Sequence, residues 1–308
     1  MDTGSTRQRP SSPSSDSGFT LTELMVGMAV MLLVTGAALS LSLSSRRAYE
    51  TDEARTHINQ NLRAGIDLLG LDVRQAGERL PPDFPALLIA DGAAGAPDTL
   101  VLRRNLLDAV LPVCEPIVAG STVASVLVAD NTAPPPGCAP VSDSNADGWP
   151  DNMEAWRAHR LANGGAVTAY LFNPATGNGE FILYDTEDAP TFSIHKTGTG
   201  AWLYNYAVSD QPRVYMLEER IYEMSADLLQ MRLSGTGAPP IHLVDRIRDF
   251  QTKVVFANGT EQDTLSAADE WSDIRSIAVT LSGMVPLRGR TIQRQWTTEF
   301  CPRNVLSH

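Results

Sequence analysis

The stretch GFTLTE at residues 18–23 lies where the character of the chain changes. It opens an apolar run at residues 19–43 in which Glu23 is the only charged residue. A carboxylate in apolar surroundings costs several kcal/mol unless a cation or hydrogen-bond donors accompany it. A cut after Gly18 would create a positively charged α-amino group on Phe19. We therefore expect that amine, in the same chain or in a neighbouring one, to be the partner of Glu23.

The leader, residues 1–18, differs from a secretory signal because it has no apolar core and the apolar run follows the cut instead of preceding it. The run of about 25 residues rises about 37 Å as a helix, enough to cross a bilayer core of about 30 Å. Arg7 and Arg9 favour a cytoplasmic amino end. The sequence thus predicts a single-pass inner-membrane protein whose remainder faces outward. The alternative is an ordinary signal anchor with a stray Glu23.

Charge and composition limit the partners of the outward-facing part. The 308 residues carry a formal net charge of −12, with 24 Lys and Arg against 36 Asp and Glu. A chain this acidic is a poor general binder of nucleic acids or of anionic lipid surfaces, so we expect no nucleic-acid partner. No run of basic residues marks a local exception.

Three cysteines in an oxidising compartment predict at least one disulfide. Cys114 and Cys138 enclose a stretch rich in Pro and Ala and form the natural pair. Cys301 is then left over near the carboxyl terminus, although spacing leaves its pairing with either of the others open. The local bridge is the pairing we expect.

Residues 44–78 predict an amphipathic continuation of the apolar helix. No proline interrupts them, and apolar residues recur in helical steps at Ile58, Leu62, Ile66, Leu69 and Val73. The helix is expected to end near Gly77, because Pro81 and Pro82 cannot continue it.

Residues 79–308 show short runs of strand-forming residues separated by Gly, Pro, Asn and Asp, a pattern that predicts strands joined by turns. We expect strands at 86–90, 99–103, 122–128, 166–172, 180–184, 191–195, 202–207, 213–224, 227–233, 250–256, 274–281 and 291–299. A long amino-terminal helix followed by many strands predicts the α+β class, with a mainly antiparallel sheet domain.

Residues 143–154 fit the twelve-residue EF-hand calcium loop at every side-chain position. The expected ligands are Asp143, Asn145 and Asp147 at positions 1, 3 and 5, the carbonyl of Trp149 at 7, Asp151 at 9, directly or through a water molecule, and Glu154 at 12. Gly148 supplies the sharp turn at position 6, and residues 153–161 predict the exiting helix. We expect a Ca²⁺ ion that orders the connection; the alternative is a turn rich in Asp and Asn that binds nothing.

Motifs for catalysis are not found in the sequence. The five histidines lack zinc-ligand spacing, and the chain has no nucleophile elbow and no phosphate-binding loop. The sequence therefore predicts a protein that is not an enzyme.

The segment at 18–26, GFTLTELMV, resembles the cleavage and methylation segment of type IV prepilins. The stretch at 61–77 resembles PilW-type minor pilins and the related GspJ-like pseudopilins, and those at 243–251 and 296–304 resemble PilW-type elements. The resemblance implies a type IV pilin-like fold, cleavage after Gly18 and methylation of Phe19 by prepilin peptidase. It also implies that Glu23 neutralises the amino terminus of an adjacent subunit.

The function implied by the resemblance is ordered polymerisation. The chain would be a minor pilin that primes or supports assembly of a type IV pilus, with major and minor pilins and the inner-membrane assembly machinery as partners. Residues 19–43 would lie in the filament core, and the globular domain would be displayed at the cell surface. Two alternatives stay open: a pseudopilin of a type II secretion system, and a pilus-tip adhesin or DNA-uptake subunit.

Overall fold

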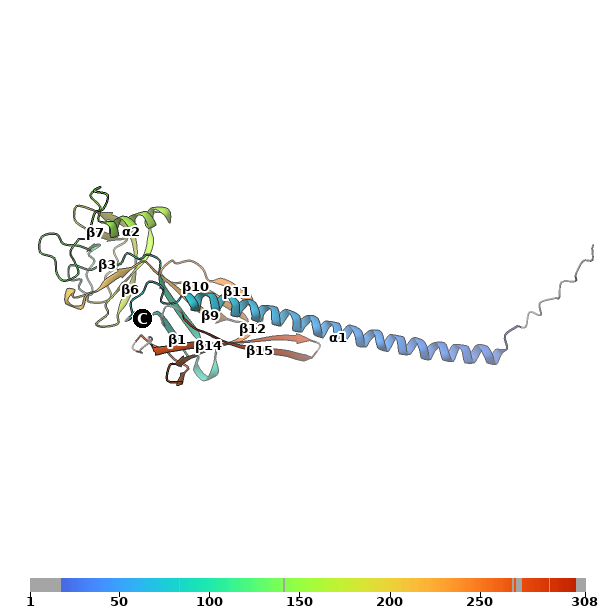
Figure 1. Cartoon of the computed structure of the whole chain (residues 1–308). Coiled ribbons are helices and arrows are strands. Elements are labelled where there is room, and N and C mark those ends of the chain that lie inside the picture. The colour runs from blue at the N-terminus through green and yellow to red at the C-terminus, as the bar shows by residue number, and fades with distance from the viewer. Residues whose placement is uncertain are drawn as a thin grey trace, which may run out of the picture. The chain divides into compact units, whose positions relative to one another are not determined.

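The computed structural model describes residues 18–82, 84–140, 142–267, 269, 273–287 and 289–302. The chain forms two compact units, Met1–Glu53 and Ala54–His308. One continuous helix, α1 (Leu21–Gln75), supplies the described helical part of the first unit and the first element of the second (Figure 1). The structure is of the α+β class, with all strand pairs antiparallel, as predicted.

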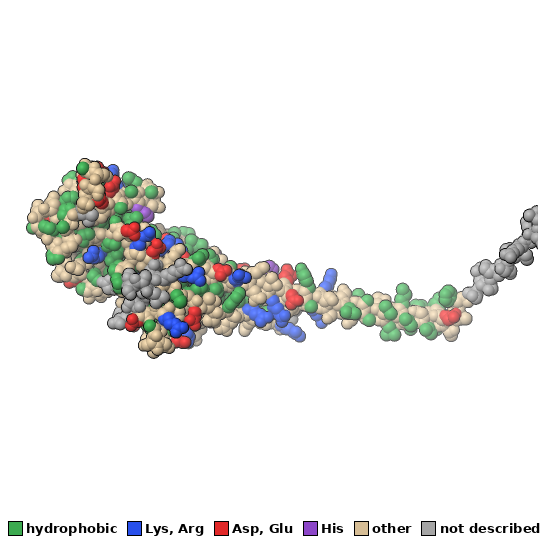
Figure 2. Space-filling view, in the orientation of Figure 1, with side chains coloured by type: hydrophobic (Ala, Val, Ile, Leu, Met, Phe, Trp, Pro, Cys, Tyr) green, Lys and Arg blue, Asp and Glu red, His purple; other side chains and the backbone are tan. Residues whose placement is uncertain are grey.

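The first unit presents its apolar side chains to the outside. Every described residue from 18 to 49 is exposed, and hydrophobic side chains cover the amino-terminal part of α1 (Figure 2). By length and composition α1 is long and apolar enough to cross a membrane, and it is the one such helix in the described part of the chain. Side chains this apolar need lipid or the helices of other subunits around them.

The carboxyl-terminal part of α1 packs into the second unit with the face that the sequence predicts. Ile58, Leu62, Ile66, Leu69 and Val73 are all buried. The helix also carries glycines at two close contacts. A Cβ at Gly65 would lie 2.8 Å from Cδ1 of Leu281, and one at Gly70 would overlap the ring of Phe300. These glycines let the helix backbone approach the sheet closely.

Two sheets pack with this part of α1 around one hydrophobic core. One has the order β1-β2-β9-β10-β11, and the other β13-β12-β14-β15. Their bounds are β1 (Leu87–Ala90), β2 (Thr99–Asn105), β9 (Leu217–Ser225), β10 (Leu228–Leu233), β11 (Ile241–Asp245), β12 (Ile247–Phe256), β13 (Glu261–Gln262), β14 (Ile274–Leu287) and β15 (Arg290–Phe300). In Figure 1 the β14–β15 hairpin runs alongside α1. We call α1 from Ala54 onward, these two sheets and the segments that connect them within residues 54–105 and 217–302 the base.

Residues 106–216 form a second substructure with a core of its own, inserted between two neighbouring strands of the base. Asn105 at the end of β2 pairs with Leu217 at the start of β9, so the chain leaves the base and returns at one point. We call residues 106–216 the insert. The sequence predicted one β-rich domain over 79–308 with only the loop at 143–154 inserted, so the extent of this insertion is new.

The insert contains a six-stranded antiparallel sheet and one α-helix. The sheet has the order β3-β8-β5-β6-β7-β4. Its elements are β3 (Leu111–Pro112), β4 (Ser125–Leu127), α2 (Asp151–Ala162), β5 (Val167–Phe172), β6 (Gly179–Asp188), β7 (Ser193–Lys196) and β8 (Arg213–Tyr215). The described residues also include the 3₁₀ turns η1 (Ala93–Gly95), between β1 and β2, and η2 (Val208–Asp210) in the insert.

Two predicted strands do not form single strands, and others differ in length, since β6 extends to Asp188 and β14 to Leu287. The expected strand at 213–224 is two strands in two different sheets, β8 of the insert and β9 of the base, because Met216 is where the chain crosses between them. The expected strand at 202–207 makes only an isolated bridge, Ile117 to Tyr206. Its apolar side chains, Trp202 and Tyr206, are buried as loop residues.

An aromatic cluster joins the insert to the base. Phe84 of the base is fully buried. Its ring lies 4.6 Å from that of Phe172, 5.0 Å from that of Tyr215 and 6.1 Å from that of Tyr170, measured between ring centroids. Aromatic pairs in this distance range stabilise a contact beyond the area they bury. The insert is therefore packed on the base.

Candidate functional site

The segment at residues 18–23 forms the start of α1 and holds Glu23 in a capping box. The backbone N–H of Glu23 donates to Oγ1 of Thr20 at 3.3 Å. In return the backbone N–H and the hydroxyl of Thr20 donate to Oε2 of Glu23 at 3.0 and 2.8 Å. This reciprocal arrangement satisfies N–H groups that a helix start leaves without partners.

The capping box places the carboxylate of Glu23 at the end of the chain that cleavage would create. Gly18 and Phe19 are exposed and precede the first residue of the helix, Leu21. The peptide bond after Gly18 is therefore accessible. The role of Thr20 is a feature that the sequence analysis missed, although the spacing Thr-x-x-Glu before an apolar run is its usual signal.

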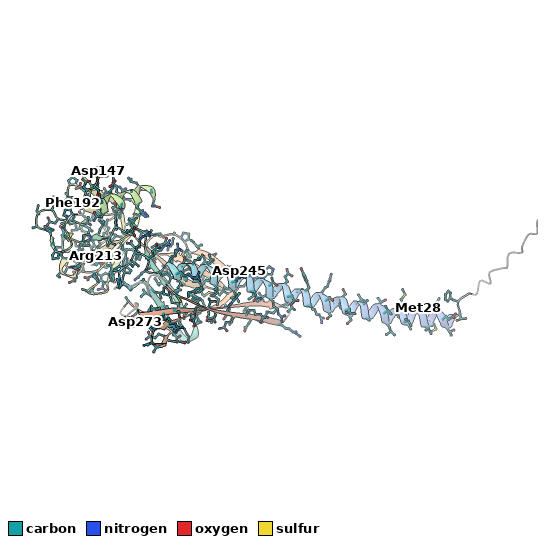
Figure 3. The ribbon with its side chains drawn as sticks, viewed as in Figure 1. Met28, Asp147, Phe192, Arg213, Asp245 and Asp273 are labelled. Atoms are coloured by element: carbon teal, nitrogen blue, oxygen red, sulfur yellow. A yellow bond between two sulfur atoms is a disulfide. The ribbon has the colours of Figure 1, made fainter. Side chains whose placement is uncertain are left out.

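The loop at 143–154 brings some of its expected ligands together. Gly148 has φ +90° and makes the turn that the motif predicts. The Asn145 amide nitrogen lies 3.3 Å from Oδ2 of Asp147 and 3.3 Å from Oε2 of Glu154. The side chains of Asn145, Asp147 and Glu154 therefore converge on one point at the surface of the insert, where Figure 3 labels Asp147.

Asp143 folds back over the same turn. Its Oδ1 accepts a hydrogen bond from the backbone N–H of Asp147 at 3.2 Å, and its Oδ2 accepts one from Gly148 at 2.8 Å. Trp149 is half-buried against the core of the insert. These contacts fix the backbone of the loop around the point where the side chains meet.

Asp151 does not join the other expected ligands. Its Oδ1 accepts a hydrogen bond from the backbone N–H of Ser144 at 2.9 Å, and its Oδ2 accepts from the hydroxyls of Ser144 and Ser142 at 2.7 and 3.0 Å. The bond from the Ser144 backbone, followed by that from its hydroxyl, lowers the pKa of Asp151. Within the residues described, no three Asp, Glu, His or Cys side chains are grouped as a metal site.

Helix α2 links the loop to the core of the insert. Glu154 stands in its first turn. Two residues later Trp156 is fully buried and donates its indole N–H to the carbonyl of Ala109 at 2.8 Å. Nearer the helix end, Arg160 makes two hydrogen bonds to Glu187, at 2.7 and 2.8 Å. Glu154 is thus held on a rigid element, while most of its expected co-ligands lie on the loop.

Comparison with known protein families assigns the amino-terminal segment. Residues 13–39 match the family described as "Prokaryotic N-terminal methylation motif". The segment is of the prepilin type. The match includes Gly18, Phe19 and Glu23, and it indicates a type IV pilin-like or pseudopilin protein. Neither the comparison with curated proteins nor that with solved structures found a match.

The prepilin-type segment implies processing by prepilin peptidase and assembly with pilins. Together with the apolar helix it fits anchoring in the inner membrane, followed by a globular domain. The family match thus covers the amino-terminal segment of this pilin-like chain, and no comparison matched its globular part.

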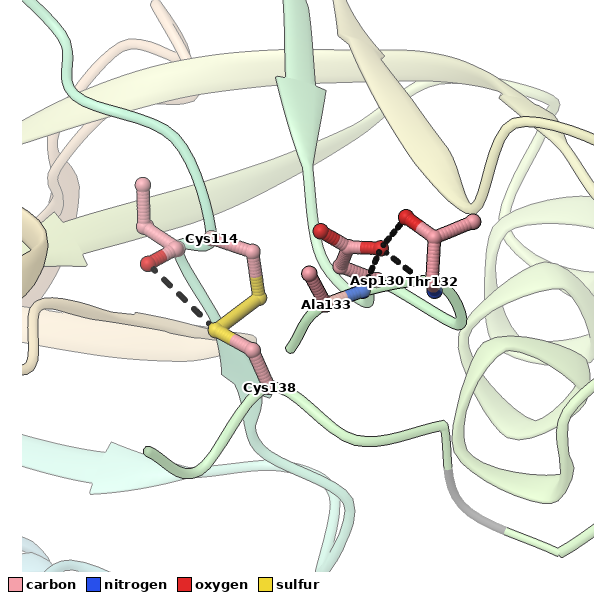
Figure 4. The surroundings of a disulfide bond; sticks show 6 residues. Cys114, Asp130, Thr132, Ala133 and Cys138 are labelled. Carbon is pink, nitrogen blue, oxygen red and sulfur yellow. Dashed lines mark hydrogen bonds between the residues drawn. A yellow bond between two sulfur atoms is a disulfide. The ribbon is translucent and has the colours of Figure 1, made fainter. Parts of the chain in front are cut away.

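The disulfide of this pilin-like chain is the predicted local one. Cys114 and Cys138 are bonded, with a Cα–Cα distance of 5.7 Å, and both are buried (Figure 4). Between them Asp130 accepts hydrogen bonds from the backbone N–H and the hydroxyl of Thr132, both at 2.8 Å. Cys301 is free and exposed. The bridge closes the segment that leads to the loop at 143–154.

Replacing both Cys114 and Cys138 by Ser is expected to destabilise the insert by about 3 kcal/mol, because the unfolded chain gains the freedom of an open loop. Urea unfolding of the full-length protein in detergent measures the change. Cys301→Ser is the control and should leave the midpoint unchanged. Equal midpoints for the double variant and the control would contradict a stabilising bridge.

Proposed function

We propose that this chain is a minor pilin of a type IV pilus, cleaved after Gly18 by prepilin peptidase and methylated on Phe19. The proposal rests on one observation above all. A prepilin-type methylation motif opens a helix whose apolar side chains are exposed throughout the first unit. Those side chains fit the lipid bilayer before assembly and the helices of neighbouring pilins afterwards.

Glu23 then has two successive partners. In the precursor the N–H and hydroxyl of Thr20 hold its carboxylate. In the filament the free amine of Phe19 of an adjacent subunit neutralises it, which offsets the cost of a carboxylate among apolar helices. The subunit primes or supports assembly with the other pilins and the inner-membrane machinery, and the insert is displayed at the cell surface. This work needs no catalytic group.

Electron microscopy of surface filaments on cells lacking this gene tests the proposal. We expect filaments to be lost or strongly reduced, and to return with the wild-type gene. Secreted proteins are measured in the same cells. Normal filaments together with blocked secretion would overturn the proposal in favour of a pseudopilin of a type II secretion system. Normal filaments, normal secretion and lost attachment or DNA uptake would indicate a tip subunit instead.

We further propose that the loop at 143–154 binds Ca²⁺ through Asp143, Asn145, Asp147, Glu154 and the carbonyl of Trp149. The convergence of Asn145, Asp147 and Glu154 at the Gly148 turn supports this proposal, because carboxylate, amide and carbonyl oxygens are the ligands that Ca²⁺ prefers. Asp151 is held by Ser144 and would act through a water molecule. The ion would order the connection from Cys138 to α2.

Adding Ca²⁺ is expected to raise the thermal stability of the full-length protein by about 1–2 kcal/mol when the ion is about tenfold above its dissociation constant. Glu154→Gln should abolish the gain, since it removes a charged ligand. Asp185→Asn, an acid-to-amide change in the same insert but outside the loop, should keep it. Differential scanning calorimetry with Ca²⁺, with Mg²⁺ and with chelator makes the comparison. An equal gain in both variants would mean that calcium acts elsewhere.

A further inference from the structure

Strand β15 forms an open edge of the base. It pairs with β14 along its whole length, from Leu287–Arg290 to Ile277–Phe300, with no shift of register. It is the last strand in its sheet, and no described strand pairs with its other side. Alternate N–H and C=O groups along that side therefore point away from the sheet, which is the geometry that accepts an added strand.

The other edge strands are shorter, and two of them are contacted by other parts of the chain. The end strands β3, β4 and β13 have 2, 3 and 2 residues. Strand β1 is bridged by Ile89 to Leu265, and β11 is contacted by Asn61 of α1, whose side chain donates to the carbonyl of Asp245 at 3.1 Å. Strand β15 has 11 residues. It is the longest edge without a partner in the described part of the chain.

The two faces of β15 differ in how their side chains are used. On one face Gln293, Thr297 and Glu299 contact β14, through Met284 at 3.8 Å, Thr280 at 2.9 Å and Ser276 at 3.2 Å respectively. The other face is the one that α1 covers, because the register partners of its residues, Leu281 and Gly283, contact α1. By alternation this face carries Arg290, Ile292, Arg294 and Trp296.

Arg290 and Arg294 are exposed and make no ion pair with any described residue. Trp296, two residues on, is 41% exposed. The edge thus presents cation, aliphatic, cation and aromatic side chains in a row, two residues apart, on a chain whose net charge is −12. A strand laid beside it would match this row with acidic, apolar, acidic and apolar side chains, since opposite charges and apolar pairs stabilise facing positions.

We propose that β15 is the docking edge for an extended segment of a neighbouring filament subunit, which adds to the sheet as an antiparallel strand. The segment carries carboxylates opposite Arg290 and Arg294 and apolar side chains opposite Ile292 and Trp296. Main-chain hydrogen bonds supply affinity, and the alternating side chains supply specificity. The identity of the neighbour rests on the proposed pilus function, whereas the chemistry of the edge can be tested without filaments.

The probe is a blocked, labelled peptide, Thr-Val-Thr-Glu-Thr-Val-Thr-Glu-Thr, added to the full-length protein in detergent. Fluorescence anisotropy gives its affinity, and hydrogen exchange followed by mass spectrometry gives the protection of β15. We expect saturable binding and slower exchange in β15. Binding should fall at least about tenfold when Lys replaces both Glu residues of the peptide, because like charges then face the arginines. A peptide with N-methylated amides should also fail to bind, since it lacks main-chain donors.

A pair of matched variants tests whether Arg290 and Arg294 are the charges that the peptide recognises. Arg290→Glu with Arg294→Glu should weaken binding of the Glu peptide at least about tenfold and restore binding of the Lys peptide. Arg275→Glu makes the same change on an exposed arginine of β14, beyond the last residue paired with β15. It should leave both affinities unchanged. Near-ultraviolet circular dichroism checks that the variants remain folded.

Two results would overturn the proposal. If neither the Glu nor the Lys peptide binds, the arginines serve only to keep other strands away from the edge. If the Glu peptide binds without protecting β15, the docking site lies elsewhere. Either result leaves the minor-pilin proposal standing, because that proposal is decided by the filaments of cells lacking the gene. If the purified protein binds the peptide but cells lacking the gene keep their filaments, the docking edge is supported and the pilus role is overturned.

Discussion

Cells that carry Gly18→Arg are expected to accumulate the precursor and to lose surface filaments. Gly18 has no side chain at the proposed cut, so we expect the bulky arginine to hinder the peptidase and to leave residues 1–18 attached. Phe19 then has no free amine, and Glu23 has no cation to neutralise it when helices pack together. A carboxylate left in apolar surroundings costs several kcal/mol, which is enough to stop a subunit from joining a filament.

Mass spectrometry of the chain isolated from membranes measures the outcome, since the wild type should lack the leader and carry one methyl group on Phe19. Ser17→Arg, which places the same side chain one residue earlier, is the control and should be processed more completely. A fully cleaved Gly18→Arg protein, or filaments built from uncleaved protein, would contradict the role assigned to this junction.

Phe84→Ala is expected to have the largest effect on stability, about 3–5 kcal/mol. Phe84 is fully buried, and it belongs to the base while its partners Tyr170, Phe172 and Tyr215 belong to the insert. The truncation leaves a cavity at the junction, so the packing of the two substructures should weaken together with the overall fold.

Urea unfolding of the full-length protein in detergent, followed by tryptophan fluorescence, measures this change. Leu203→Ala in the insert is the control, because Leu203 is 68% exposed and its truncation should stay within about 0.5 kcal/mol. Two separated unfolding transitions in Phe84→Ala, against one in the wild type, would show that the aromatic cluster couples the substructures. A loss below about 1 kcal/mol would contradict a tightly packed junction.

The helix could be predicted from sequence because its signal is local. Ile58, Leu62 and Ile66 recur at helical spacing, and the structure buries all three. The end near Gly77 also follows from nearby residues, and α1 ends at Gln75. Many strands were predicted for the same reason: β1, β2, β5 and β10 each differ from their expected ranges by no more than two residues at either end.

What the sequence did not reveal depends on pairing over long distances. Nothing near Asn105 or Leu217 indicates that they lie opposite each other, because the whole insert separates the two residues in the sequence. The strands β3 and β13 were missed because they have only two residues each. Strand β11 (IHLVD) was missed although Ile241 and Leu243 alternate with His242.

Among the candidate sites, too, those with a local sequence signal could be predicted and those set by distant contacts could not. Glu23 and the pair Cys114–Cys138 follow from a motif and from short spacing, and the disulfide is confirmed. The calcium motif predicted the Gly148 turn correctly, whereas the hydrogen bonds of Asp151 to Ser144 were not predicted. That carboxylate is taken by Ser144, a contact that a motif written as ligand positions does not contain. The sequence does not indicate that β15 is an edge strand, because its position at the end of the sheet depends on how all the strands of that sheet pair.

The position of the insert has a consequence for how such chains change over evolution. Its two ends are register partners in the β2–β9 pair, so they stay about 5 Å apart whatever lies between them. Lengthening or shortening the loops of the insert does not shift the register of β2 and β9. The exposed surface of the insert can therefore diversify as long as Tyr170, Phe172 and Tyr215 keep their packing on Phe84.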